Sequence, residues 1–159
     1  MRESKTNAMR LFDRAQKPYR VHSYGDGQSF SDGVSVARAV GFPPEQLFKT
    51  LVTHGASGGY FVFVIPADCE LHLKKAARAA GEKAIEMLPM KDLKNVTGYI
   101  RGGCSPFAMK KQFPTVFDET AILFETILVS AGVLGCQIEA APEDMVTLAA
   151  ATYADLCQD

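Results

Sequence analysis

A continuous apolar stretch, residues 60–65, constrains the fold of this chain more than any other segment. Its sequence is Tyr-Phe-Val-Phe-Val-Ile, and Pro66 ends it. Because it has no alternating polar positions, it predicts a strand buried on both faces at the centre of a sheet. The chain has 159 residues, enough for one core of the size that buries such a strand. We therefore expect a single domain over residues 1–159.

The other segments show helix and strand patterns without a strict β-α-β order. Ala8, Leu11, Phe12 and Ala15, for example, have the i, i+3, i+4, i+7 spacing of one apolar helix face. Helices are expected at 5–16, 33–40, 71–80, 90–95 and 142–150, with one helical turn at 43–46. Strands are expected at 19–24, 47–54, 115–118, 126–130 and 136–139, with an extended piece at 83–87. This mixture predicts a mixed α/β sheet or barrel.

The composition favours a cytoplasmic protein without a membrane partner. No apolar run is long enough to span a bilayer, and the N-terminus lacks the apolar core of a signal peptide. The four cysteines form no Cys-x-x-Cys pair, and no histidine lies at ligand spacing from any of them. We therefore expect reduced thiols, no metal site and no cofactor.

The net charge of −1 conceals an uneven distribution. Residues 71–111 contain nine basic and three acidic side chains, whereas residues 112–159 contain eight acidic and no basic ones. Two interpretations are open. Either the basic segment binds a polyanion on one side of the protein, or the distant segments interleave on the folded surface and cancel.

The segment 97–106 is poor in ordinary packing residues and rich in constrained backbone. It contains Gly98, Gly102 and Gly103, followed by Ser105 and Pro106. Glycine adopts conformations closed to other residues and lets another molecule approach the main chain closely. The segment is either a tight turn or a shaped loop whose N–H groups bind a ligand.

Lys49 is the first candidate for chemistry. On the strand expected at 47–54 its side chain shares a face with Leu47 and Leu51, so it is either a snorkelling edge residue or a buried cation with an anionic partner. Together with the N–H groups of the glycine-rich loop, Lys49 could hold an anionic group or a polarised carbonyl without a protein nucleophile. Such a site fits ester hydrolysis by bound water, and it also fits a nucleotide-binding pocket.

The three histidines form no recognisable triad, and Ser130, at a strand end, is either a turn serine or a ligand contact.

Five motifs, taken in order, resemble the YbaK/EbsC family, which contains free-standing relatives of the editing domain inserted in bacterial prolyl-tRNA synthetases. Each motif is weak alone, but their order and spacing agree over nearly the whole chain. The motifs are 47–52 (LFKTLV), 71–77 (LHLKKAA), 97–106 (TGYIRGGCSP), 127–132 (ILVSAG, followed by Gly135 and Ile138-Glu139) and 141–144 (APED).

The resemblance implies a fold, an activity and a set of site residues. The fold is a barrel-like mixed sheet with helices packed outside, and the activity is hydrolysis of wrongly charged aminoacyl-tRNA. Lys49 is implied as the pocket lysine on which activity depends, while Cys104 receives no catalytic role and is interpreted as a packing thiol. The residues implied to contact the substrate are Tyr24, Phe30, Thr50, Gly102, Gly103, Ser105, Pro106, Ser130 and Gly132.

The expected substrate is cysteine attached to the proline tRNA, and the expected partners are aminoacyl-tRNA and prolyl-tRNA synthetase. In cysteine-specific members of the family the substrate's own thiol is thought to attack the ester. Many of those members carry a Lys-Arg pair in the turn that is occupied here by residues 131–135, where Val133 and Leu134 stand instead. Alanine or serine as the edited amino acid, or a non-catalytic module that binds an aminoacyl nucleotide or a synthetase, are therefore alternatives. The sequence leaves the oligomeric state open.

Overall fold

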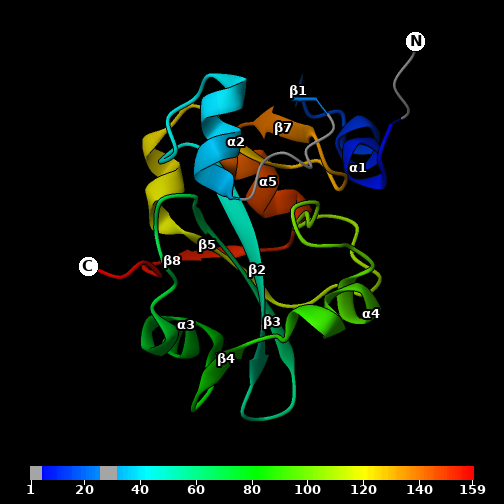
Figure 1. The fold of residues 1–159 in the computed structure, drawn as a ribbon. Coiled ribbons are helices and arrows are strands. Elements are labelled where there is room, and N and C mark those ends of the chain that lie inside the picture. Colours follow the sequence, from blue (N-terminus) through cyan, green and yellow to red (C-terminus); the bar gives the residue numbers. More distant parts are fainter. Residues whose placement is uncertain (1–4, 26–31) are drawn as a thin grey trace.

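The computed structural model describes residues 5–25 and 32–159 (Figure 1). Within these residues the α-helices are α1 (Asn7–Ala15), α2 (Gly33–Val40), α3 (Leu73–Ala80), α4 (Leu93–Thr97) and α5 (Pro142–Leu148). Two 3-10 helices are η1 (Met90–Asp92) and η2 (Glu119–Leu123). The strands are β1 (Arg20–Ser23), β2 (Phe48–Gly55), β3 (Tyr60–Pro66), β4 (Ile85–Met87), β5 (Thr115–Asp118), β6 (Ile127–Ser130), β7 (Cys136–Ala140) and β8 (Thr152–Ala154). None of the helices in these ranges is both long and apolar enough to cross a membrane.

Strand β3 lies at the centre of a five-stranded sheet with the order β4-β2-β3-β5-β8. It pairs antiparallel with β2 and parallel with β5, so the sheet is mixed. Val62, Phe63, Val64 and Ile65 expose none of their surface. The predicted buried central strand is confirmed, and so is the mixed α/β class.

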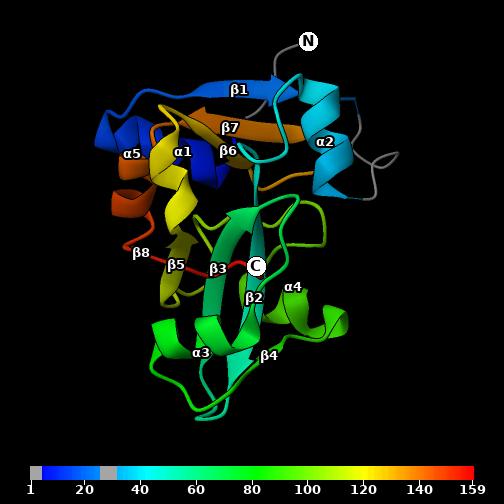
Figure 2. The same ribbon diagram turned by 90° about the vertical axis from the view of Figure 1, so that its left-hand side faces the viewer.

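The second sheet, β1-β7-β6, is antiparallel and lies across the end of the first sheet at which β2 begins (Figure 2). The two sheets meet where Leu47 forms a parallel bridge with Leu128, whose N–H donates to the Gln46 carbonyl oxygen at 3.0 Å. The described strands therefore form two sheets joined at this bridge, and the expected barrel-like closure is not confirmed.

Helices cover both ends of this framework. Helix α3 packs on the five-stranded sheet through Ala76 and Ala77, which contact the cluster around Phe63. Helix α2 covers the junction of the two sheets, because its buried Ala37 belongs to the same cluster as Leu47 and Leu128. In Figure 1, α3 and α4 lie on opposite sides of the long β2–β3 hairpin. This placement leaves the beginning of β2 bordered by α2, by the second sheet and by the segment after α4.

Several expected elements differ in detail from the structure. The helix expected from residue 71 begins at Leu73, because the His72 ring accepts a hydrogen bond from the Lys75 N–H at 3.2 Å and so caps it. The helix expected at 90–95 is split into η1 and α4, and the expected helical turn at 43–46 is a turn closed by a 3.0 Å bond from Gln46 N–H to the Pro43 carbonyl. Helix η2 and strand β8 were not expected, since both are short and depend on tertiary contacts.

The basic and acidic parts of the chain interleave in part. Lys75, from the basic segment, lies 3.0 Å from Asp155 and 3.2 Å from Asp159. Lys17 of the N-terminal part lies 3.7 Å from Asp144. For Lys17 and Lys75, these ion pairs confirm the interpretation that distant basic and acidic segments interleave on the folded surface and cancel.

The central strand gives a stability prediction. Phe63→Ala removes a fully buried ring from the cluster under α3, so we expect a loss of about 3–5 kcal/mol in the free energy of unfolding. Leu123→Ala is the control, because that side chain is 76% exposed on η2, and its expected loss is below about 0.5 kcal/mol. Urea denaturation followed by circular dichroism measures both, and equal losses would contradict the placement of β3 in the core.

Candidate functional site

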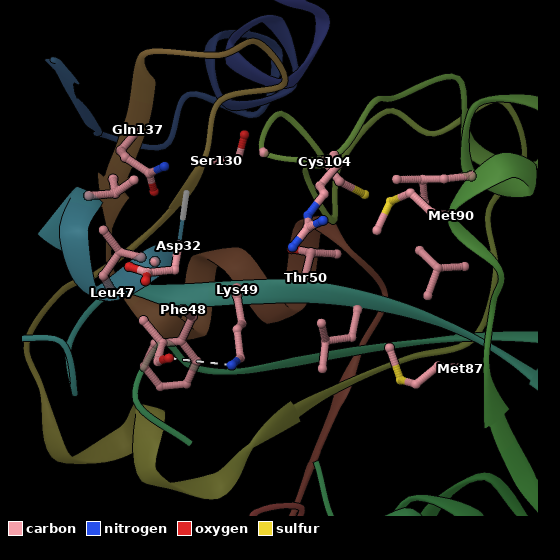
Figure 3. Close-up of a pocket in the computed structure, with 18 of the residues that line it drawn as sticks. Asp32, Leu47, Phe48, Lys49, Thr50, Met87, Met90, Cys104, Ser130 and Gln137 are labelled. Carbon is pink, nitrogen blue, oxygen red and sulfur yellow. Dashed lines mark hydrogen bonds between the residues drawn. The ribbon is translucent and has the colours of Figure 1, made fainter. Parts of the chain in front are cut away.

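A cavity of about 410 Å³ opens beside the first half of β2 (Figure 3). Its walls come from β2, from the ends of β6 and β7, from the start of α2, and from the segment between β4 and residue 104. The side chains that line it are mostly apolar, with a few polar groups among them, which is the usual composition of a small-ligand site.

Lys49 forms part of the cavity wall. Strand β2 lies between β4 and β3 in the sheet, and Lys49 pairs with Ile65 in the register of β2 and β3. Its half-buried side chain donates from Nζ to the carbonyl oxygen of Ala67 at 3.3 Å, the dashed line in Figure 3. Among the described residues Lys49 has no ion pair. It is therefore neither a surface-edge residue nor one half of a protein salt bridge, and its ammonium remains available to a ligand.

Asp32 supplies a carboxylate to the same cavity. It caps α2, and the Ser35 N–H donates to its Oδ1 at 2.7 Å. This backbone hydrogen bond is the main reason that the pKa of Asp32 is lowered, with a smaller contribution from the positive charge of Lys49. The cavity thus holds a negative group and a positive group on different elements.

Two buried polar atoms in the cavity residues have no hydrogen-bond partner among the described residues. They are Oγ1 of Thr50 and Oε1 of Gln137. The Gln137 side chain is 5% exposed, and its Nε2 donates to the Tyr24 hydroxyl at 3.3 Å. Because an unsatisfied buried polar group costs free energy, these two atoms require a hydrogen-bond partner, which a ligand or a water in the cavity can supply.

The glycine-rich loop contacts both the cavity and the turn after β6. Gly102 lines the cavity with φ at +84°, and a Cβ there would come within 2.8 Å of Leu134 Cδ2. The Gly103 N–H already donates to the Ile100 carbonyl at 3.0 Å, whereas the N–H groups of Gly102 and Cys104 have no acceptor among the described residues. Since Gly102 and Cys104 both line the cavity, their N–H groups are available to a ligand there. The interpretation as a shaped loop is favoured over that of a simple turn.

The structure brings some of the predicted site residues together and separates others. Those that line the cavity are Tyr24, Lys49, Thr50, Gly102 and Ser130. Phe30 lies outside the described residues.

The remaining predicted residues support the loops around the cavity. The buried Ser105 hydroxyl accepts from the Phe107 N–H at 3.3 Å, and Pro106 lines a separate hollow of about 210 Å³. Gly132 donates its N–H to Ser130 Oγ at 3.1 Å, and Gly103 is buried against the backbone of Val133 and Leu134. None of these four is among the residues that line the cavity.

Gln137 is the main site residue that sequence reasoning missed. The β6–β7 hairpin places it opposite Ser130, so the two polar residues enter the cavity from adjacent strands. The sequence offered only a weak signal, an amide between Cys136 and Ile138 on a strand in which Glu139 is the one residue that is not buried.

Cys104 borders the cavity but is a poor nucleophile. Burial raises the pKa of its thiol to about 12, and burial also raises the pKa of the neighbouring Tyr99 to about 12. A thiol with such a pKa is protonated at neutral pH, and the thiolate is the reactive form. The interpretation of Cys104 as a packing thiol agrees with this environment.

Alkylation tests the protonation state of Cys104. Its folded pKa of about 12 lies above the ordinary 9.0, so burial stabilises the fold below pH 9 and that contribution is lost as the pH rises toward 12. At pH 8 we expect Cys104 to react with iodoacetamide about a thousandfold more slowly in the native protein than in urea, because its thiolate fraction is that much smaller. Mass spectrometry of the Cys104 peptide measures both rates, and similar rates would show that the thiol is not protected.

Comparison with known proteins identifies the family to which this chain is similar in sequence. The model of the aminoacyl-tRNA editing domain matches residues 31–148. A protein of Enterococcus faecalis, provisionally named the Cys-tRNA(Pro)/Cys-tRNA(Cys) deacylase EbsC, is 47% identical over 154 residues, which cover 97% of this chain and 94% of the relative.

Two solved structures show the same fold. One is described provisionally as a trans-editing enzyme for prolyl-tRNA synthetase, with a TM-score of 0.82 at 23% identity and coverage of 98% of this chain and all of that one. The other is a hypothetical protein with a TM-score of 0.87 at 20% identity, covering 96% of this chain and all of that one. Because the family model spans most of the chain and the Enterococcus relative matches nearly all of it, this protein belongs to the aminoacyl-tRNA editing domain family.

Proposed function

We propose that this protein is a deacylase that acts in trans on mischarged tRNA, with cysteine on the proline tRNA as its substrate. The observation that carries the proposal is the unpaired Lys49 ammonium in the wall of a cavity that also contains buried polar atoms without partners. Membership in the editing-domain family supports the class of reaction. The name of the 47% identical relative supports cysteine as the amino acid.

Lys49 has the role of polarising the ester in this proposal. An aminoacyl ester is already activated, so orientation and charge stabilisation supply a large part of the rate. The ammonium faces the carbonyl oxygen and stabilises the negative charge that develops when a nucleophile adds to the carbonyl carbon. The bond from that carbon to the ribose oxygen then breaks, and the ribose oxygen takes up the proton that the nucleophile loses. Attack by water releases the free amino acid, whereas attack by the substrate's own thiol releases it as a cyclic thioester.

The polar atoms of the cavity orient the aminoacyl group. The α-ammonium of the substrate donates to Gln137 Oε1 and lies on the side of the ionised Asp32, and Thr50 Oγ1 completes its hydrogen bonding with the ester. Water or the substrate's own thiol serves as the nucleophile, since Cys104 is protonated. A tRNA charged with S-methylcysteine distinguishes the two, because that substrate has no free thiol.

Lys49→Ala is the primary test. We expect kcat/KM on Cys-tRNA(Pro) to fall by at least about 100-fold, because a preorganised charge at the carbonyl is lost. The thermal midpoint should stay within a few degrees of the wild type. Lys74→Ala, at an exposed position on α3, is the matched control and should keep full activity.

The assay also decides between the alternatives. It is run on proline tRNA charged with cysteine, alanine and serine, with and without prolyl-tRNA synthetase, which we propose as the partner. Hydrolysis of the alanine or serine ester alone would change the assigned amino acid. Tight binding of an aminoacyl-adenylate analogue with no turnover on any of the three would identify a binding module and contradict the proposal.

Thr50→Val gives a second prediction with opposite effects on stability and activity. Valine has nearly the same shape as threonine, and the substitution removes a buried hydroxyl that has no partner in the described structure. We expect the free energy of unfolding to rise by about 1 kcal/mol, since an unsatisfied polar group is removed. We expect kcat/KM to fall about tenfold, the size of one lost hydrogen bond. A variant that is both less stable and fully active would show that Thr50 has only a structural role.

A further inference from the structure

Four exposed cations belong to η1, to α4 and to the segment that follows α4, the elements that form one side of the cavity. They are Lys91, Lys94, Arg101 and Lys110, which we call the basic rim. None of them forms an ion pair with a described residue, in contrast to Lys17 and Lys75. The acidic side chains on β4 and η1 are Glu86 and Asp92, so the positive charges outnumber the negative ones.

Cavity-lining residues and contacts around α4 place the basic rim at the opening of the cavity. Met90 and Leu93, next to Lys91 and Lys94 in sequence, line the cavity, and so does Arg101 itself. The Lys110 N–H donates to the carbonyl oxygen of Thr97, the last residue of α4, at 3.0 Å. The side chain of Lys110 runs past Gly98, with Cγ 3.1 Å from the position of a Cβ on that glycine. These contacts make α4 and the following loop one surface at the opening.

The opening has a charge gradient and an apolar edge. In Figure 3, Asp32 lies on one side of Lys49, and Met87 and Met90 lie on the other. The two methionines line the cavity, yet their side chains are 46% and 54% exposed. Methionine sulfur makes favourable contacts with aromatic rings, so this edge fits the face of a nucleobase.

An aminoacyl-tRNA 3′ end has the complementary arrangement. Its α-ammonium is positive, its terminal adenine is an aromatic ring, and the phosphates that precede the adenosine are negative. With the ammonium on the side of Asp32, the adenine meets the methionine edge and the phosphates continue toward the basic rim. An acidic protein would match the charges of the rim but has no nucleobase for the methionine edge.

We propose that the acceptor arm of the tRNA lies along the basic rim, with phosphates at Lys91, Lys94, Arg101 and Lys110 and the terminal adenine against Met87 and Met90. The inference rests on the proposed deacylase function and names the surface on which its substrate binds. It also agrees with the turn at 131–135, which has no basic residue of its own to bind phosphates.

The test compares two triple variants with the same change in charge. The rim variant is Lys91→Gln/Lys94→Gln/Lys110→Gln. The control is Lys74→Gln/Arg78→Gln/Lys83→Gln, which removes three exposed cations on and after α3, on the far side of the β2–β3 hairpin from α4. Each is assayed on Cys-tRNA(Pro) and on a minimal ester, cysteine linked to adenosine.

For the rim variant we expect the ratio of kcat/KM on tRNA to kcat/KM on the minimal ester to fall at least about tenfold, because three phosphate contacts are lost. The logarithm of kcat/KM on tRNA should also depend less steeply on the logarithm of salt concentration, by about 2 to 3 in slope. The control variant should keep both the ratio and the slope of the wild type. An unchanged ratio in the rim variant, or an equal fall in both variants, would overturn the inference.

Direct binding separates this inference from the proposed function. Fluorescence anisotropy measures the affinity of each variant for an uncharged acceptor-stem RNA hairpin that ends in CCA. If the wild type hydrolyses neither substrate but the rim variant alone loses affinity for the hairpin, the deacylase proposal fails and the basic rim is retained as an RNA surface. Binding of poly-glutamate as tightly as the hairpin would overturn the assignment of the rim to RNA.

Discussion

The antiparallel pairing of β2 with β3 is the interaction on which the rest of the structure depends. Seven residue pairs join the two strands, from Phe48 opposite Pro66 to His54 opposite Tyr60. Because Val62 to Ile65 of β3 are fully buried, this pairing fixes the position of β2, and with it the position of Lys49. The lysine is thus held on a rigid strand and not on a loop, which is where a group that must meet a carbonyl oxygen is best placed.

The same pairing organises both sides of the cavity. The Ala67 carbonyl that accepts from Lys49 directly follows β3, so strand and acceptor move as one unit. The bridge between Leu47 and Leu128 then sets the second sheet against the start of β2, which brings Ser130 and Gln137 to the opening. A polar site is therefore assembled where two sheets meet, with apolar clusters beneath it on each side.

The sequence predicted those parts of the molecule that have a strong local signal. The apolar run of β3, the residues around Lys49 and the glycine-rich loop are examples, because a few consecutive residues determine each of these features. Ser105 and Pro106 could not be separated from Gly102 in this way, since all belong to one motif and only tertiary packing turns the first two away from the cavity. Gln137 was missed because its importance comes from an atom left unsatisfied in three dimensions. The joining of two sheets at one bridge, in place of a closed barrel, likewise depends on contacts between residues about 80 positions apart.

The last strand has a consequence for the way in which the chain acquires its structure. Strand β8 adds to the edge of the five-stranded sheet, and the buried Asp118 carboxylate accepts from the Leu156 N–H at 2.9 Å. Leu156 is fully buried under α3, and its carbonyl accepts from the His72 N–H at 2.8 Å. The cluster around Phe63 therefore cannot close while a ribosome still holds residues 152–158, although β2, β3 and α3 have already been synthesised. The five-stranded sheet is completed only after this segment has emerged, so until then the β5 edge is an unpaired strand edge on which another chain could pair.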